Sequence, residues 1–200
     1  MNFLFRIKEK EISDIDTTIL HTSSFNYNED ILELINHKCE VITNNSIVDI
    51  NTIPLKLIEE FNCQDLLKKG KLTKIDELTI NVLSSLKSDK NIIVFFHVLM
   101  FLESERKKQI IKRLKEQGKR IINYTSEIEE TCYLDYIMVV HQNKIIMEGK
   151  TKYVLLEEKI LKKLGFSLPF IVELSNGLKY YNLIEKIYFD SESLVNELWK

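Results

Sequence analysis

The sequence predicts an α/β fold, a mostly parallel sheet with helices that is followed by a C-terminal helical tail. Between Lys90 and Gly149, apolar runs of a few residues alternate with helical patterns. Such alternation is typical of parallel β/α layering. Beyond residue 152 the apolar residues recur at helical spacing instead. We therefore expect an α/β domain at residues 1–151 and a helical tail at residues 152–200.

Four apolar runs in the central stretch are expected to be strands, at 92–96, 120–124, 136–140 and 145–147. A charged helix at 104–117 should end at Gly118, and a short amphipathic helix is expected at 126–134. Gln142-Asn143-Lys144 is hairpin-like and should join the last two strands. The central stretch thus predicts strand, helix, strand, helix, strand.

The first ninety residues are expected to contribute both strands and helices. Strands are predicted at 3–7, 17–21, 39–42 and 46–50, the last two joined by the turn pair Asn44-Asn45. Apolar residues at helical spacing predict helices at 29–37, 54–61 and 74–86, and Pro54 suits a first helical turn.

The tail should contain three helices. The first is expected at 153–164, with Gly165 at the position that follows its end. The second is expected from Leu168-Pro169 to about Tyr181. Asp190 is the expected N-cap of a last helix at 191–199.

Composition limits the function. The chain has 200 residues and a net charge of −2, which gives no overall footprint of a nucleic-acid binder. Its three cysteines form no Cys-x-x-Cys pair and its four histidines no metal-binding spacing. No apolar run approaches the roughly 18–20 residues that span a bilayer. We therefore expect no metal and a cytoplasmic protein, with peripheral attachment to the inner face of the membrane as one option.

Glycine is scarce. The chain has five glycines, of which Gly70 is the first, and it contains no Gly-x-x-x-x-Gly-Lys-Ser/Thr sequence. A phosphate-binding loop of that kind uses glycines so that its backbone N–H groups can approach the phosphates. The sequence therefore predicts no Walker A loop and no bound nucleotide cofactor.

Two segments resemble a known family. A pattern of ABC-type ATPases resembles the residues of Leu134–Val140 followed by Lys144–Lys150. The C-terminal helical tail of one subgroup of these ATPases resembles Lys162–Leu174 together with Ser193–Leu198. The chain is most similar there to the ATP-binding subunits of energy-coupling factor (ECF) transporters, over roughly residues 67–200. The resemblance implies a truncated P-loop NTPase or ABC ATPase-like sheet, in which residues 29–86 correspond by position to the helical subdomain that contacts the membrane partner.

The resemblance also locates the catalytic positions, and each is substituted. Phe96 stands at the magnesium-binding Asp, His97 at the general-base Glu and Ser126 at the switch His. His97 also reads as an ordinary histidine at a strand end. Ser126 with Glu129 makes a Ser-x-x-Glu capping box, which would explain both residues structurally. We therefore expect no catalytic residue and a pseudo-ATPase.

The resemblance also implies interfaces, and this chain retains more of the interface positions than of the catalytic positions. Leu67–Lys71, with Gly70, occupies the place of the signature sequence, and Glu103 that of the D-loop Asp. The alternative for Leu67–Lys71 is a basic surface turn. The tail could supply a dimer face through its apolar residues, or it could pack on its own domain; the residues of that face are Ile171, Leu174, Leu178 and Tyr181.

Because the interfaces are retained and the catalytic positions are substituted, we expect a structural or regulatory partner of an ECF-type or ABC membrane transporter. The expected partner is a transporter ATPase or a transmembrane subunit, and the chain is expected to form a homodimer or a heterodimer. One alternative is a degenerate P-loop-fold nucleic-acid-binding protein of a CRISPR-associated type, suggested by the basic residues between Arg106 and Arg120. The usual interpretation of such a run is a solvated helix face. The other alternative is a paralogue without a function.

Overall fold

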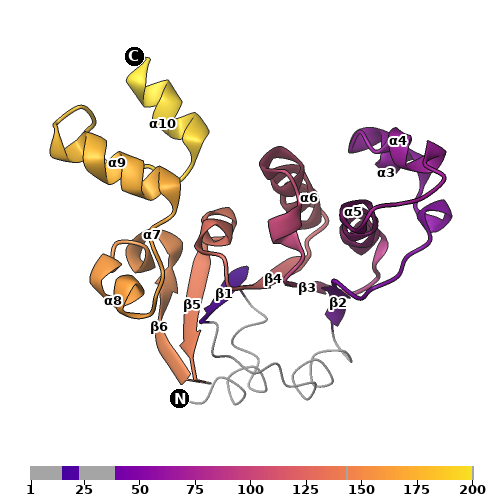
Figure 1. Cartoon of the computed structure of the whole chain (residues 1–200), viewed down its shortest axis with the longest axis horizontal. Helices are drawn as coiled ribbons and strands as arrows, with labels where there is room; N and C mark the ends of the chain where they lie inside the picture. Colours follow the sequence, from indigo (N-terminus) through magenta and orange to yellow (C-terminus); the bar gives the residue numbers. More distant parts are fainter. Residues whose placement is uncertain (1–14, 23–38, 143, 200) are drawn as a thin grey trace.

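A computed structural model of the chain describes residues 15–22, 39–142 and 144–199 (Figure 1). The strand expected at 3–7 and the helix expected at 29–37 lie outside these residues. The described part contains one six-stranded sheet in the order β2-β3-β4-β1-β5-β6. Its strands are β1 (Thr17–His21), β2 (Cys39–Thr43), β3 (Ile92–Phe96), β4 (Arg120–Thr125), β5 (Tyr136–His141) and β6 (Lys144–Lys150).

Strand β1 sits inside the sheet, between two strands that come much later in the chain. It pairs in parallel with β4 on one side and with β5 on the other. Strands β2, β3 and β4 also run parallel, whereas β6 is antiparallel to β5. The carboxyl ends of five parallel strands therefore meet at one edge, and β1 marks the point where the strand order reverses.

The helices of the described residues are short apart from α5, α6 and α9. Before β4 the chain forms η2 (Ile50–Thr52), α3 (Leu55–Glu60), α4 (Gln64–Lys68), α5 (Lys74–Ser84), η3 (Ser85–Lys87), η4 (Leu99–Phe101) and α6 (Ser104–Glu116). After β4 it forms η5 (Ile128–Tyr133), α7 (Thr151–Val154), α8 (Glu158–Lys163), α9 (Phe170–Tyr180) and α10 (Ser191–Leu198).

One face of the sheet carries the described helices (Figure 1). Alternate residues of β2, β3 and β4, among them Ile42 and Phe95, pack with α3 to α6 in the largest core cluster. Alternate residues of β1 and β5, among them Leu20 and Val139, pack with α7 to α9. The other face is also buried, and its core residues are Ile19, Val94, Ile122, Tyr124, Met138 and Val140.

Most local predictions are confirmed. Strands form at each apolar run of the central stretch and at 17–21 and 39–43, and helices form at 55–60, 74–84 and 104–116. Gly118 and Gly165 follow helix ends with φ of +72° and +88°, which glycine adopts without steric cost. Asp190 caps α10 by accepting a hydrogen bond from the Ser193 N–H at 2.8 Å.

Three predicted elements differ in the structure. Residues 46–49 form no strand, because the Ser46 N–H and C=O bond to Thr43 and to the Asn81 amide rather than to a neighbouring strand. The helix expected at 126–134 is the 3-10 helix η5. The helix expected at 153–164 breaks into α7 and α8 at Leu155–Glu157, and the break lets Leu155 and Leu161 both face the core.

Candidate functional site

The candidate site lies at the carboxyl edge of the parallel strands, beside the point where the strand order reverses. Ligands of open α/β sheets bind at such an edge. Register places Phe96 of β3 opposite Tyr124 of β4, and Ile19 of β1 opposite the same tyrosine. Because the side chains of these residues share one face of the sheet, His21 at the end of β1 reaches the residues that end β3.

Two histidines from these strand ends form a hydrogen-bonded pair. The Nε2 atoms of His21 and His97 lie 2.9 Å apart, and the Nδ1 atom of His21 lies 2.9 Å from the carbonyl oxygen of Thr22. A carbonyl oxygen can only accept, so the proton of neutral His21 is assigned to Nδ1. It follows that the Nε2–H group of His97 donates to the Nε2 atom of His21.

Aromatic rings enclose the pair. Tyr124 stacks on Phe96 with ring centroids 4.5 Å apart and on His21 with centroids 4.6 Å apart. The rings of His21 and His97 meet edge to face at 4.8 Å. The position after β3 therefore holds an imidazole inside an aromatic cluster.

The backbone fixes His97 in an uncommon conformation. Its φ is +53°, and its N–H donates a hydrogen bond of 3.0 Å to the carbonyl oxygen of Tyr124. A positive φ is uncommon outside glycine, although histidine is enriched among the residues that adopt it. The turn after β3 thus directs the His97 ring toward β1.

Both imidazoles have lowered pKa values. Burial, and after it the neighbouring His21, lowers the pKa of His97 from 6.5 to about 4. Burial also lowers the pKa of His21, partly offset by its hydrogen bond to the Thr22 carbonyl. Burial disfavours the charged form of a base, so the pair is neutral at pH 7.

Ser126 does not form the expected capping box. The N-cap of η5 is Glu127, without a side-chain hydrogen bond, and the Glu127 N–H donates to the Thr125 hydroxyl at 3.0 Å. This local bond competes with helix formation at Ser126. Glu129 instead accepts a 2.7 Å hydrogen bond from the N–H of Phe170, so it caps the first turn of α9 and ties the tail to η5.

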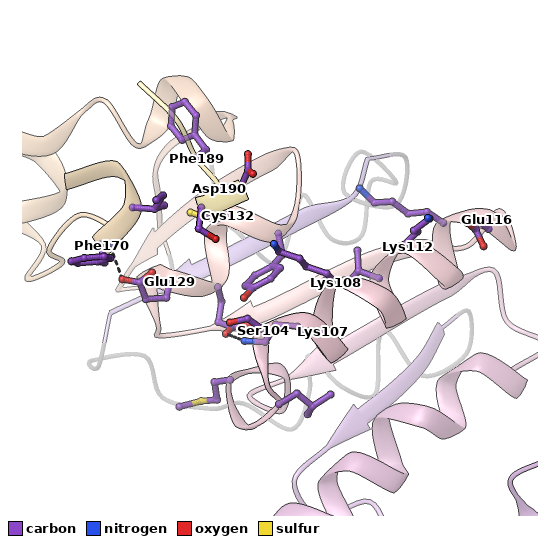
Figure 2. Close-up of a pocket in the computed structure, with 18 residues that line it drawn as sticks. Ser104, Lys107, Lys108, Lys112, Glu116, Glu129, Cys132, Phe170, Phe189 and Asp190 are labelled. Carbon is purple, nitrogen blue, oxygen red and sulfur yellow. Dashed lines mark hydrogen bonds and ion pairs between the residues drawn. The ribbon is translucent and has the colours of Figure 1, made fainter. Parts of the chain in front are cut away.

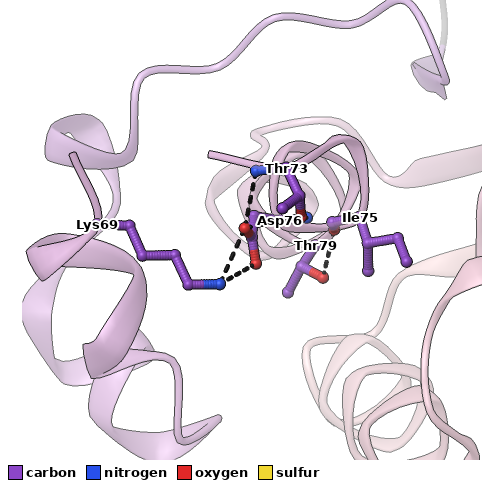
Figure 3. A network of polar contacts seen from close by, with 5 residues as sticks. All are labelled: Lys69, Thr73, Ile75, Asp76 and Thr79. Carbon is purple, nitrogen blue, oxygen red and sulfur yellow. Dashed lines mark hydrogen bonds and ion pairs between the residues drawn. The ribbon is translucent and has the colours of Figure 1, made fainter. Parts of the chain in front are cut away.

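The turn with Gly70 leads into a helix terminus that is already satisfied (Figure 3). Thr73 and Asp76 form a capping box at the start of α5, and the Lys69 ammonium binds both oxygens of Asp76 at 2.8 and 2.9 Å. The Lys69 hydrogen bond and those from Thr73 lower the pKa of Asp76 from 3.8 to about 2. Gly70 itself is exposed, which fits the surface-turn alternative as well.

The predicted interface residues differ in how far their side chains are exposed. Glu103 is exposed at the N-cap of α6 and makes no side-chain cap. Ile171 and Leu178 of α9 are half-buried against their own tail, whereas Leu174 of α9 and Tyr181, which follows it, are 40% and 72% exposed. Sequence reasoning missed Phe170, which is 68% exposed on the same side of α9 four residues before Leu174.

Much of the basic run on and after α6 is engaged inside the protein. Lys107 forms a buried ion pair with Glu130, and Lys115 lies 3.5 Å from Asp16 and 3.2 Å from Asp135. Lys119 donates to the backbone carbonyls of Ser88 and Lys90. These pairings leave a smaller basic surface than the sequence suggests.

The described residues contain neither a metal-binding cluster nor a membrane-spanning helix. Among residues 15–22, 39–142 and 144–199, no group of three or more His, Cys, Asp or Glu side chains could hold a metal ion. None of the helices in that part of the chain has the length and apolar character needed to cross a bilayer.

Comparison with known proteins relates the chain to transporter ATP-binding proteins. It is 29% identical over 125 residues to the energy-coupling factor transporter ATP-binding protein EcfA1 of Mycoplasmopsis synoviae, which covers 60% of this chain and 46% of that protein. It is 30% identical over 125 residues to the protein of the same name from Mesomycoplasma hyopneumoniae, covering 60% and 44%. The chain thus spans less than half the length of these curated relatives.

A solved structure supports the fold. A bacterial Atm1-family ABC exporter with ATP bound matches 76% of this chain and 36% of its own at a TM-score of 0.61 and 10% identity. No model of a protein family matches the chain. The chain is therefore homologous, over about 60% of its length, to the ATP-binding subunits of ECF transporters, and its α/β fold is like that of ABC ATPases.

Proposed function

We propose that this chain is a catalytically inactive ABC ATPase-like protein that acts as a structural or regulatory partner of an ECF-type or other ABC membrane transporter. Its relatives are named as transporter ATP-binding proteins. The observation that carries the proposal is the end of β3, where the resemblance puts two carboxylates and the chain has Phe96 and His97.

The residues at this edge do not fit a magnesium nucleotide. Magnesium prefers oxygen ligands in near-octahedral geometry. Phe96 presents a ring stacked on Tyr124, and His97 is committed to its hydrogen bond with His21. The 17 residues that follow His21 along the chain also contain no glycine with which to bind phosphates. Phosphoryl transfer depends on positioning and charge neutralisation, and Phe96 and His97 supply neither to a magnesium nucleotide.

The start of α5 supports the same conclusion. A helix N-terminus binds anions through unsatisfied N–H groups and the helix dipole. Here Asp76 already supplies the negative charge, and its own counterion is Lys69. This terminus, which follows the signature-like Leu67–Lys71, is thus occupied by groups of the chain itself.

Exposed apolar side chains mark two surfaces where partners would bind. One is the helical segment α3 to α5, where Leu55 at the start of α3 is 64% exposed and Ile75 at the start of α5 is 58% exposed. The other is the tail, where Leu174 on α9 and Tyr181 at its C-terminal end are exposed. The first would contact a transmembrane subunit at the cytoplasmic side of a membrane, and the second would pair two ATPase-like subunits.

Nucleotide binding tests the proposal directly. Calorimetric titration with ATP and Mg²⁺ should show no saturable binding below about 1 mM, and no phosphate should be released. The EcfA1 protein of Mycoplasmopsis synoviae serves as the positive control under the same conditions. Micromolar binding by this chain, or turnover above the buffer rate, would refute the inactive assignment.

Partner binding is tested separately. The tagged chain, purified in detergent from host membranes, should retain an integral membrane protein in stoichiometric amount. Leu55→Glu with Ile75→Glu should release it, whereas Lys159→Glu with Lys163→Glu on α8 should not. Recovery of the chain alone from the soluble fraction would contradict the transporter role. Light scattering with and without Mg-ATP should give one oligomeric state in both cases.

A further inference from the structure

A groove separates α6 from the tail, on the face of the sheet that carries the helices (Figure 2). Its volume is about 1020 Å³, at the upper end of the usual range for ligand sites. Five segments contribute to it, namely η4, α6, η5 and the first turns of α9 and α10. It lies apart from the histidine pair and belongs to no catalytic position of the resemblance.

The groove has apolar and aromatic walls. On the α6 side its base is formed by the buried residues Leu102 and Ile111. On the tail side, Phe170 is 68% exposed at one end and Phe189 is half-buried (Figure 2). Such a lining suits an aliphatic or aromatic anchor rather than a hydrated ion.

The acidic groups in the groove are already used. Glu130 is paired with Lys107 inside the protein, and burial raises the pKa of its carboxyl group. Glu129 accepts from the Phe170 N–H, and Asp190 accepts from the Ser193 N–H. The fourth, Glu116, lies 3.5 Å from Arg113, so each of the four carboxylates has a donor within the fold.

Two cations in the groove are not used. Lys108 and Lys112 are four residues apart on α6, so they lie on one side of that helix, as Figure 2 shows. Neither is within ion-pair distance of a carboxylate in the part of the chain that the structure describes, whereas the nearby Lys115 and Arg113 both are. The groove thus has an apolar base and, along its α6 edge, two lysines without an ion-pair partner among the described residues.

We propose that this groove binds an acidic amphipathic peptide segment of a partner protein. Aliphatic or aromatic side chains of the segment would enter between Ile111 and Phe170, and its Asp or Glu residues would face Lys108 and Lys112. Helix-in-groove binding uses such anchors for affinity, and charge complementarity sets specificity and association rate. This inference goes beyond the proposed function and does not depend on it.

Selection from a random 12-residue peptide display library tests the proposal. Peptides enriched on the wild-type chain should contain at least two acidic residues and one large apolar residue. Each synthetic peptide would then be labelled with fluorescein and its Kd measured by anisotropy. Lys108→Glu with Lys112→Glu should weaken binding at least tenfold, and Phe170→Ala at least threefold. Raising the salt from 50 to 300 mM should also weaken it.

The matched control is Lys159→Glu with Lys163→Glu. These two lysines are exposed and, like Lys108 and Lys112, four residues apart, but they lie on α8 outside the groove. The control changes net charge equally and should leave Kd within twofold. Circular dichroism melts establish that each variant is folded.

Three outcomes would overturn the proposal. The first is that the enriched peptides are basic or uncharged. The second is that they bind both charge-reversal variants equally well. The third is that no peptide is enriched on the wild-type chain relative to the Lys108→Glu/Lys112→Glu protein. Laurate provides a further arm, because a groove that binds this amphiphilic anion but no peptide is a lipid site instead.

Discussion

The histidine pair should make folding stability fall in mild acid. The folded pKa of His97, about 4, lies below its ordinary value of 6.5. Between these values the unfolded chain binds a proton that the folded chain does not, so stability is lost as the pH falls. The contribution is fully present above pH 6.5 and is lost progressively toward pH 4.

The structure sets the size of this loss. One pKa unit corresponds to about 1.4 kcal/mol, so the interval from 6.5 to about 4 corresponds to about 3 kcal/mol. His97 is only half-buried, and solvent screening reduces the figure to roughly 1.5–2 kcal/mol. His21 titrates with it as a coupled pair, so the observed midpoint belongs to both rings.

The variant His97→Asn removes the titrating ring, and asparagine tolerates the positive φ of this position. The free energy of unfolding would be measured by urea titration at pH 7.5, 6.0 and 4.5, with circular dichroism as the probe. The wild type should lose roughly 1.5 kcal/mol more than the variant between pH 7.5 and 4.5.

The comparison needs a control because other groups titrate in the same range. His141→Asn removes a histidine of the same edge that hydrogen-bonds to Thr22 instead of joining the pair. Parallel pH profiles for the wild type and His97→Asn would refute the reasoning. A profile in which His141→Asn flattens the curve more than His97→Asn would also refute it.

Three further predictions concern the ion pairs and caps, and each is measured as a free energy of unfolding, at pH 7 unless another pH is given. Asp76→Asn should cost roughly 1–2 kcal/mol. It should cost more than Lys69→Met because the Asp76 carboxylate also caps α5. The difference in cost between these two variants should disappear as the pH falls from 3.8 toward 2. Lys107→Met should cost about 3–5 kcal/mol because it leaves Glu130 charged and buried. Adding Glu130→Gln to Lys107→Met should recover part of this loss. Additive costs of the two substitutions in the double variant would contradict the prediction. Glu129→Ala should cost roughly 1 kcal/mol and raise proteolysis of the tail, and an unchanged cleavage rate would contradict its capping role.

Local pattern was enough to predict the elements that depend on neighbouring residues. Strands β3 to β6 form at the apolar runs, and the helix ends at Gly165 and Asp190 form as expected. Each of these features depends on interactions among a few neighbouring residues. The break between α7 and α8 depends on which side chains reach the core. The apolar periodicity of one segment does not give this information, because it depends on tertiary packing.

The candidate site was predicted only in part. The resemblance located Phe96 and His97, but the partner of His97 is 76 residues away in sequence and is reached only through the pairing of β1 with β4. Ser126 and Glu129 have the spacing of a capping box, yet Glu129 bonds to Phe170, 41 residues further on. Spacing identifies local bonds, and a competing long-range donor overrides them.

The position of β1 also has a consequence for how the chain folds during synthesis. Its pairing partners β4 and β5 begin at Arg120 and Tyr136, about one hundred residues later. At roughly 5–20 residues per second, β1 leaves the ribosome several seconds before either partner. The β2–β3 pair can form earlier, but the middle of the sheet stays open until β5 is made. Folding speed should therefore be set by this late insertion of an early strand, because non-local pairing costs loop-closure entropy before it is rewarded.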